Sequence, residues 1–258
     1  MAYLFFIGTA SGKTSKSRFH SSILISTSDY NLLVDAGDGI SKAFLVQNID
    51  YNTIDGVILT HLHPDHYTGL ASLIVQMTMC ERRNDLDIFV NSELKKVIKN
   101  FITNSYLYTD RLGFDINYHS FNNDILFKVS DEINFKSRQN SHLASVAEIE
   151  ENSGQSFSCS SFLFNVGDKE IFYTSDVGSE RDLHLFDDYK YSYLVSEITH
   201  IQPEIITNKT VKDNSSPQII FTHYSEEDIA NLEKFIANLG ADLKSRVILA
   251  FDRLKIEL

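Results

Sequence analysis

The sequence predicts an α/β protein in which β-sheets are layered with helices. Short apolar runs typical of strands occur in both halves of the 258-residue chain, and helical patterns lie between several of them. The hydrophobic share of 43% is ample for a packed core, and a chain of this length fits one large domain or two fused halves. Composition and periodicity support layering and do not specify the order of the layers.

Strands are predicted where β-branched and aromatic residues cluster between turn residues. In the first half, these runs are Tyr3–Ile7, Ser22–Ser26, Leu32–Val34, Gly56–Thr60 and Asp87–Val90. Apolar residues at helical spacing predict helices over Ile40–Gln47, Tyr67–Arg82 and Ser92–Asn104. The first half is therefore expected to mix strands with helices.

The second half is richer in strands. Its predicted strands are Ile125–Val129, Ile133–Lys136, Ser160–Asn165, Glu170–Thr174, Tyr193–Ser196, Gln218–Phe221 and Arg246–Phe251. One helix is expected over Ser225–Leu239, because Ser225 can cap it and the three acidic residues that follow favour the positive end of a helix. Both halves thus contribute sheet and helix.

Charge and composition limit the expected partners. The net charge is −12, and long nucleic acids are bound mainly through phosphate neutralisation by basic residues, so such a partner is not expected. No segment approaches the roughly 18 unbroken apolar residues of a membrane helix, so no membrane partner is expected either. The two cysteines suggest no disulfide framework, which makes a reduced, cytoplasmic setting the default. The sequence leaves open whether the chain forms a homodimer.

The most informative segment is HLHPDH at residues 61–66. It follows a predicted strand and precedes a predicted helix, so it can aim several side chains at one point. His61 and His63 share one face of an extended chain, whereas Asp65 and His66 follow Pro64, which suits a first helical turn. The first pair can serve one metal ion and the second pair another. Imidazole with carboxylate suits zinc, iron or manganese.

This segment resembles the HxHxDH signature of the metallo-β-lactamase superfamily, and the resemblance covers nearly the whole chain. Four further segments carry it, in the expected order: FIGTA at 6–10, LVDAGDG at 33–39, YTSDVG at 173–178 and FTHYS at 221–225. The resemblance implies a four-layer αββα sandwich, with residues 1–258 forming one metallo-β-lactamase-fold domain. It also implies a site at one edge of the two sheets.

The resemblance further implies two sets of metal ligands. One ion would be bound by His61, His63 and His142, the other by Asp65, His66 and His223, with Asp176 bridging both. His142 is the best placed for the third histidine of the first set, and His119 is its main rival. Structural or surface roles are preferred for His20, His119, His184 and His200 as far as metal binding is concerned.

Within the superfamily, the chain is similar to the ribonuclease Z-like branch of metal-dependent phosphodiesterases. The VSEITH segment at residues 195–200 resembles the His-Glu-Ala-Thr segment of ribonuclease Z, although Ser196 stands where that segment has its histidine. Glu197 and Thr199 match the glutamate and threonine. The alternative for Glu197 is a surface carboxylate at the end of a strand.

Ribonuclease Z usually inserts a tRNA-gripping arm between the positions that match His142 and Asp176. Only 33 residues separate these positions here, and Glu148, Glu150 and Glu151 make the interval acidic. The resemblance therefore favours a small phosphodiester or nucleotide over tRNA as the substrate.

The segment Gly8–Thr14 resembles a phosphate-binding P-loop without meeting its spacing. It has three residues between its glycines where the motif needs four, and no helical pattern follows it. Gly12, Lys13 and Lys16 are therefore expected in a solvated loop near the site, with contact to an anionic substrate as the alternative.

The chemistry implied is hydrolysis by a hydroxide held between two divalent ions, with zinc preferred and manganese or iron as alternatives. Asp65 is expected to act both as a ligand and as a proton acceptor, and Glu197 with His200 is the candidate for protonating the leaving group. Two alternatives remain. One is a hydrolase of a carbonyl substrate, such as a lactone, thioester or β-lactam, and the other is a metal-binding scaffold without turnover.

Overall fold

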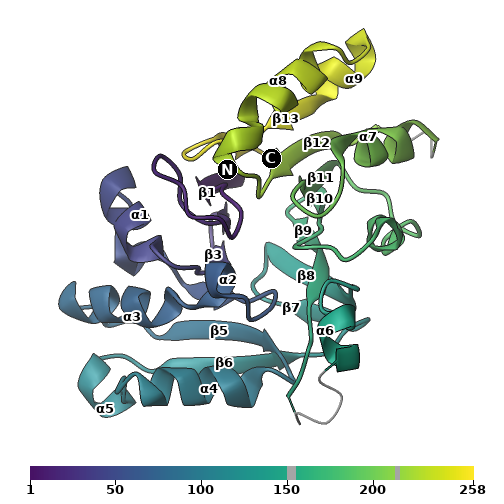
Figure 1. The fold of residues 1–258 in the computed structure, drawn as a ribbon. Helices are drawn as coiled ribbons and strands as arrows, with labels where there is room; N and C mark the ends of the chain where they lie inside the picture. Colours follow the sequence, from purple (N-terminus) through teal and green to yellow (C-terminus); the bar gives the residue numbers. More distant parts are fainter. Residues whose placement is uncertain (150–154, 213–215) are drawn as a thin grey trace.

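The computed structural model describes residues 1–149, 155–212 and 216–258, and it shows two β-sheets packed face to face (Figure 1). Helices cover the outer face of each sheet. One apolar cluster lies between the two sheets, and a separate cluster lies between each sheet and its helices. This arrangement is the four-layer αββα sandwich that the resemblance implies.

The first sheet contains seven strands, and at one edge the last strand of the chain pairs with the first. Its spatial order is β14 (Lys255–Glu257), β1 (Tyr3–Gly8), β2 (Ser22–Ser26), β3 (Asn31–Val34), β4 (Gly56–Ile58), β5 (Leu86–Asn91) and β6 (Ile116–Phe121). Strands β1 to β3 are antiparallel neighbours, whereas β3 to β6 run parallel. Parallel strands place their carboxyl ends at one edge of the sheet, where sites form in α/β proteins.

The second sheet repeats this plan. Its order is β13 (Val247–Leu249), β12 (Gln218–Thr222), β11 (Tyr193–Glu197), β10 (Lys169–Tyr173), β9 (Ser160–Val166), β8 (Ile133–Gln139) and β7 (Leu126–Lys128). Strands β7 to β10 are antiparallel neighbours, and β10 to β13 run parallel. Each sheet therefore brings one edge of carboxyl ends to the seam between the two halves.

The helices fill the connections between strands. The α-helices are α1 (Ile40–Gln47), α2 (Pro64–Tyr67), α3 (Leu70–Met79), α4 (Lys95–Asn104), α5 (Thr109–Leu112), α6 (Ala144–Ile149), α7 (Pro203–Lys212), α8 (Ile229–Ala237) and α9 (Ala241–Arg246), and the 3-10 turns are η1 (Tyr51–Thr53), η2 (Glu180–His184) and η3 (Glu226–Asp228). None of the helices in the described residues combines the length and apolar character needed to cross a membrane.

An aromatic core separates the two sheets. Phe121, Phe135 and Phe162 are fully or almost fully buried, and their ring centroids lie 5.1 to 5.6 Å apart. Edge-to-face contacts of this kind add to the free energy gained by burying the rings. On the outer side of the first sheet, Phe44 of α1 and Leu73 of α3 pack into a second buried cluster.

The helix predicted over Tyr67–Arg82 is interrupted in the structure. Tyr67 is the last residue of α2, Thr68 and Gly69 follow it, and α3 runs only from Leu70 to Met79. A Cβ atom at Gly69 would lie 1.9 Å from the carbonyl oxygen of Gly37, so the chain at this point packs directly against another backbone segment. The contact requires a glycine at the break, and apolar periodicity does not reveal it.

Two other boundaries near the C-terminus differ from the prediction. The helix expected over Ser225–Leu239 begins with η3, and Ser225 makes no capping bond, since its Oγ lies 3.4 Å from Oγ of Ser11 instead. Arg246 ends α9, so β13 begins one residue later than predicted. Strands β6 and β14 and helices α5, α6, α7 and α9 were not predicted. Strand β6 is a half-exposed edge strand, which gives a weak apolar signal.

Candidate metal centre

The HLHPDH segment leaves the end of β4 and enters α2, as its sequence predicts. The backbone of His63 is extended, and Pro64 is the first helical residue. The remaining candidate ligands come from the second half, each from just beyond a strand: His142 after β8, Asp176 after β10 and His223 directly after β12. The fold therefore brings four separate segments to one point at the seam.

The first group of donor atoms surrounds one oxygen of Asp176. One ligand atom from each of His61, His63, His142 and Asp176 lies within 4.8 Å of the others. Nε2 of His142 lies 3.1 Å from Nδ1 of His63 and 3.6 Å from Oδ2 of Asp176, and Nε2 of His61 lies 4.0 Å from the same oxygen. Three imidazoles and a carboxylate at these spacings could hold one divalent ion.

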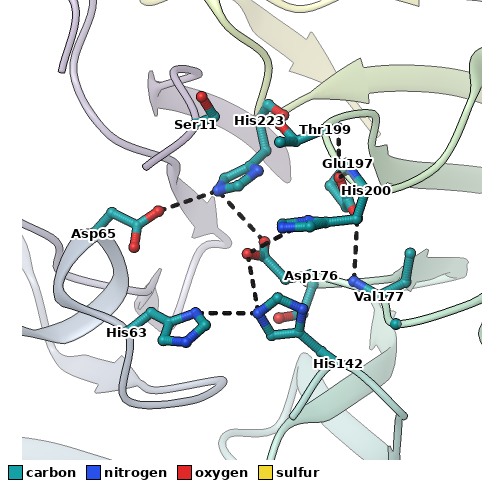
Figure 2. Close-up of polar contacts among 12 residues, drawn as sticks. Ser11, His63, Asp65, His142, Asp176, Val177, Glu197, Thr199, His200 and His223 are labelled. Atoms are coloured by element: carbon teal, nitrogen blue, oxygen red, sulfur yellow. Dashed lines mark hydrogen bonds and ion pairs between the residues drawn. The ribbon is translucent and has the colours of Figure 1, made fainter. Parts of the chain in front are cut away.

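The second group faces the other oxygen of Asp176. Oδ1 of Asp176 lies 3.4 Å from Nε2 of His66 and 3.5 Å from Nε2 of His223. Oδ2 of Asp65 lies 3.5 Å and 3.2 Å from the same two nitrogens. Figure 2 shows Asp176 between His142 on one side and His223 with Asp65 on the other. One carboxylate thus serves both groups.

A buried carboxylate behind the cluster orients two of these histidines. Oδ2 of Asp35 accepts hydrogen bonds from Nδ1 of His66 at 2.7 Å and from Oγ1 of Thr60 at 2.9 Å. Nδ1 of His61 lies 3.0 Å from the same threonine hydroxyl and donates to it, since that hydroxyl already donates to Asp35. Both rings therefore carry their proton on Nδ1 and present Nε2 to the cluster.

The donor set fits a pair of divalent ions. The Nε2 atoms of His61 and His66 are buried and have no hydrogen-bond partner among the described residues. Buried polar atoms are rarely left without a partner, and both of these face the carboxylate oxygens of Asp176. Metal coordination would satisfy both nitrogens.

The two carboxylates of the cluster stay ionised. Burial acts to raise the pKa of Asp65, but the hydrogen bond from His223 and the charge of His66 outweigh it and hold the pKa at about 2. Burial likewise acts to raise the pKa of Asp176, and the charges of His223 and His66 hold it well below its usual range. Ionised carboxylates are the form that binds metal ions.

The buried histidines differ in their affinity for protons. Burial lowers the pKa of His61 well below its ordinary value, and the neighbouring His66 lowers it further. Burial also acts to lower the pKa of His66, but the carboxylates of Asp176 and Asp35 raise it well above the ordinary value. Metal binding at Nε2 of His66 therefore competes with a proton.

Glu197 is buried and serves as an acceptor, so it is not the surface carboxylate offered as the alternative. Its side chain is 1% exposed, and it accepts hydrogen bonds from the backbone N–H groups of Val177, Thr199 and His200. Oε1 also accepts from Nδ1 of His200 at 3.1 Å. With these bonds Glu197 holds His200 in place and has little capacity left for substrate.

His200 lies at the cluster, which corrects the preference for a structural or surface role. Its ring centroid is 4.8 Å from that of His142, and Nδ1 lies 4.0 Å from Oδ2 of Asp176. The hydrogen bond to Glu197 is the main cause that raises the pKa of His200 above its ordinary value. Its side chain is 39% exposed, so a substrate can reach it.

The other histidines lie away from the described ligand groups. His119, the rival of His142, is in β6, where Nε2 bonds to Asp87 at 2.8 Å and the ring stacks on Phe89. His184 pairs with Asp187, and Nδ1 of His20 bonds to the carbonyl oxygen of Ser11. The sequence prediction for His142 over His119 agrees with this placement.

The loop that resembles a P-loop borders the second group of donors. Gly12 lies against the carboxylate of Asp65. Lys13 donates to Glu227 at 2.7 Å and remains largely exposed, while the backbone N–H of Lys16 donates to Glu226. The loop is solvated, as expected, and is fastened to the turn that follows His223.

Three supporting residues were missed by sequence reasoning, namely Asp35, Asn140 and Asp182. Asp35 lies in the quoted LVDAGDG segment directly after a buried strand, so its position was a usable signal. Asn140 donates to the carbonyl oxygen of Asp176, and Asp182 accepts from the backbone of Ser141. Neither has a local sequence pattern that indicates these long-range bonds.

His142→Ala is expected to weaken the binding of one of two ions by more than the roughly 10–100-fold that loss of a supporting residue costs. His119→Ala is the matched control, and it should leave both affinities unchanged because His119 bonds to Asp87 instead. Titration of chelator-stripped protein in competition with a chromophoric chelator measures both affinities. Loss of an ion from the His119 variant alone would contradict the assignment.

Comparison with known proteins places the chain among related sequences. Residues 2–235 match the family described as "Anti-Pycsar protein Apyc1". Ribonuclease Z of Methanococcus aeolicus is 29% identical over 128 residues, which cover 50% of this chain and 39% of that protein. Ribonuclease Z of Pyrococcus furiosus is 31% identical over 119 residues, which cover 46% and 38%. The chain thus spans less than two fifths of the length of these relatives.

Solved structures share the fold over the whole chain. The metallo-β-lactamase fold protein YhfI from Bacillus subtilis superposes with a TM-score of 0.74 and 17% identity, covering 99% of this chain and 98% of that one. Human tRNase Z, short form, gives a TM-score of 0.71 and 16% identity with the same coverage. These identities show the fold alone, so the chain has the metallo-β-lactamase fold.

Proposed function

The chain belongs to the family of the anti-Pycsar protein Apyc1, and we propose that it is a two-metal phosphodiesterase that hydrolyses a small phosphodiester or nucleotide. The relatives named ribonuclease Z support phosphoester chemistry. A solved diphosphatase of the PhnP family is consistent with it. That structure superposes with a TM-score of 0.68 and 16% identity, covering 99% of this chain and 96% of that one.

The position of Asp176 is the observation that carries the proposal. Its Oδ2 atom faces His61 and His142, and its Oδ1 atom faces His66 and His223. A carboxylate shared in this way is suited to hold two ions side by side. The ions proposed are zinc, with manganese or iron as alternatives, because imidazole and carboxylate ligands suit all three.

Two divalent ions held by these residues would lower the pKa of a bound water molecule and neutralise charge on the phosphate oxygens. Asp65 directs Oδ2 towards His66 and His223, which leaves Oδ1 to accept a proton from the attacking water. His200 lies beside the cluster in a partly exposed position, and Glu197 favours its protonated form. It is therefore placed to give a proton to the leaving oxygen, with Glu197 holding the ring.

His200→Ala is expected to lower the turnover of a nucleotide substrate about 10²–10⁴-fold, the usual contribution of a general acid. The loss should be much smaller for bis-p-nitrophenyl phosphate, because p-nitrophenolate leaves without being protonated. Metal content should remain at two ions per chain.

His184→Ala is the matched control for this variant, since His184 pairs with Asp187 on the surface away from the cluster. Equal losses on the two substrates, or a loss of metal, would show that His200 does not act as the acid.

A small substrate is proposed over folded tRNA. The chain carries 23 Lys and Arg against 35 Asp and Glu, and tRNA affinity needs many phosphate contacts from basic residues. In the interval where ribonuclease Z usually has its arm, Glu148 lies exposed on α6, whereas Glu150 and Glu151 fall outside the described residues. The chain therefore offers little positive surface for a long polyanion in the described part of this interval.

A substrate panel tests the proposal. Protein reconstituted with zinc or manganese would be assayed on bis-p-nitrophenyl phosphate, cyclic nucleotides, a precursor tRNA, a lactone and nitrocefin. We expect metal-dependent cleavage of the phosphodiesters, with little processing of the tRNA. Turnover of the lactone or nitrocefin without phosphodiester cleavage would move the chain to carbonyl hydrolysis, and no turnover with bound metal would indicate a scaffold.

A further inference from the structure

A buried carboxylate outside the ligand groups ties together the turns that carry His142 and Asp176. Asp182 lies in η2 and is 4% exposed. Its Oδ1 atom accepts a hydrogen bond from the backbone N–H of Ser141 at 3.1 Å. Its Oδ2 atom accepts from Oγ of Ser141 at 2.8 Å and from the backbone N–H groups of Gly178 and Ser179 at 2.8 and 3.2 Å.

The donors to Asp182 flank the two candidate ligands. Ser141 directly precedes His142, and Gly178 follows Asp176 by two residues. A Cβ atom at Gly178 would lie 2.2 Å from the carbonyl oxygen of Ser141, so the two turns are in backbone contact. A single carboxylate thus fixes the spacing of two segments that lie more than thirty residues apart in the chain.

A neutral side chain reinforces this connection. Nδ2 of Asn140 donates to the carbonyl oxygen of Asp176 at 2.9 Å, while its Oδ1 accepts from the backbone N–H of His142 at 3.1 Å. Asp182 is the charged member of the pair, and hydrogen bonds to an ionised acceptor are roughly twice as strong as neutral ones. Asp182 is therefore expected to dominate the spacing of the turns.

We propose that Asp182 is a positioning residue that sets the affinity of the ion bound by His61, His63 and His142. Its hydrogen bonds go to Ser141, Gly178 and Ser179, so it acts through the turns that carry His142 and Asp176. The proposal rests on the two-metal function proposed above, and it assigns a role to a residue that contacts neither substrate nor metal.

The test compares Asp182→Asn with Asp187→Asn. The asparagine at 182 can keep its oxygen where Oδ2 accepts three bonds, but it then places an amide N–H group against the N–H of Ser141. The control removes the carboxylate of Asp187, five residues further along the chain. This carboxylate bonds to Lys209 and His184 and is not part of the contacts between the two turns. Both variants would be stripped of metal, checked by thermal unfolding, and titrated with zinc against a chromophoric chelator.

We expect Asp182→Asn to weaken one zinc site about 10–100-fold, the usual cost of losing a residue that orients a ligand. The affected site should be the one that His142→Ala removes. Asp187→Asn should bind both ions as the wild type does. A purely structural role would lower the unfolding midpoint of the stripped protein without this selective loss of affinity.

Ser141→Ala provides a second variant if the Asp182 variant fails to fold. It removes the hydroxyl that bonds to Asp182 and lies 3.2 Å from Oγ of Ser179, but it keeps the backbone bond to Asp182, so it should weaken the same site by a smaller factor. If Asp182→Asn folds and binds zinc with unchanged affinities, the proposal is overturned. If Asp182→Asn does not fold, unchanged affinities in Ser141→Ala overturn it. If the wild type binds a single ion, the two-metal function fails, whereas the role of Asp182 stands when its variant weakens that ion. A wild type that binds no zinc overturns both.

Discussion

Asp176→Ala is expected to abolish hydrolysis and to reduce the metal content from two ions per chain to less than one. Asp176 is the residue whose two oxygens face both groups of histidines, so its removal opens both sites at once. Metal ions supply several kcal/mol of transition-state stabilisation. Since each 1.36 kcal/mol is a factor of ten, the rate should fall by at least about 10³-fold.

Metal analysis of reconstituted protein and turnover of bis-p-nitrophenyl phosphate measure the two effects. Asp87→Asn is the matched control, because Asp87 bonds to Tyr30 and His119 in the first sheet and lies outside both ligand groups. Retention of two ions by the Asp176 variant would refute the bridging assignment, whatever happened to its activity.

Removal of metal from the wild type is expected to lower its thermal unfolding midpoint on the order of 20 °C. A ligand present at 1,000 times its dissociation constant stabilises the folded state by about 4 kcal/mol, so two sites contribute about 8 kcal/mol. A domain of 150–250 residues shifts by roughly 2–4 °C per kcal/mol. The metal ions add this much to the free energy of unfolding because their ligands come from separate segments, which are far apart in the unfolded chain and do not bind the ions there.

Scanning calorimetry with excess zinc and then with excess chelator measures this shift. The Asp176→Ala variant should unfold at nearly the same temperature under both conditions, since it retains little metal to lose. An unchanged midpoint in the wild type would mean that the histidine cluster is assembled without any contribution from metal.

The ligand segments of the site could be predicted from the sequence, and the supporting contacts between distant segments could not. The HLHPDH segment carries four donors within six residues, and the structure brings all four to one point. His200 was named with Glu197 as the candidate acid, but a structural or surface role was preferred for it where metal binding is concerned, because its place beside Asp176 depends on the buried Glu197, whose burial leaves no trace in the local sequence. Asp182 likewise acquires its role only when η2 folds against the turn at Ser141.

The strands with the strongest apolar signal were predicted best. Strand β2 is buried over its whole length, and its predicted bounds, Ser22–Ser26, match those observed. Strand β6 is partly exposed and was missed, although it completes the first sheet. The break between α2 and α3 lies where Gly69 approaches the backbone of Gly37, which is 32 residues earlier in the chain. Contacts of this kind exist only after the helices have packed on the sheet.

The two halves of the sandwich also meet through a backbone hydrogen bond, because the N–H of Ser160 in β9 donates to the carbonyl oxygen of Thr60, next to His61. The aromatic rings between the sheets, Phe135 and Phe162 among them, therefore act as a spacer for the ligand groups. A thinner or thicker aromatic layer would alter the distance between the ligands that come from the two halves. A core substitution that changes the volume of these rings is therefore expected to change the distances between candidate ligands that it does not touch.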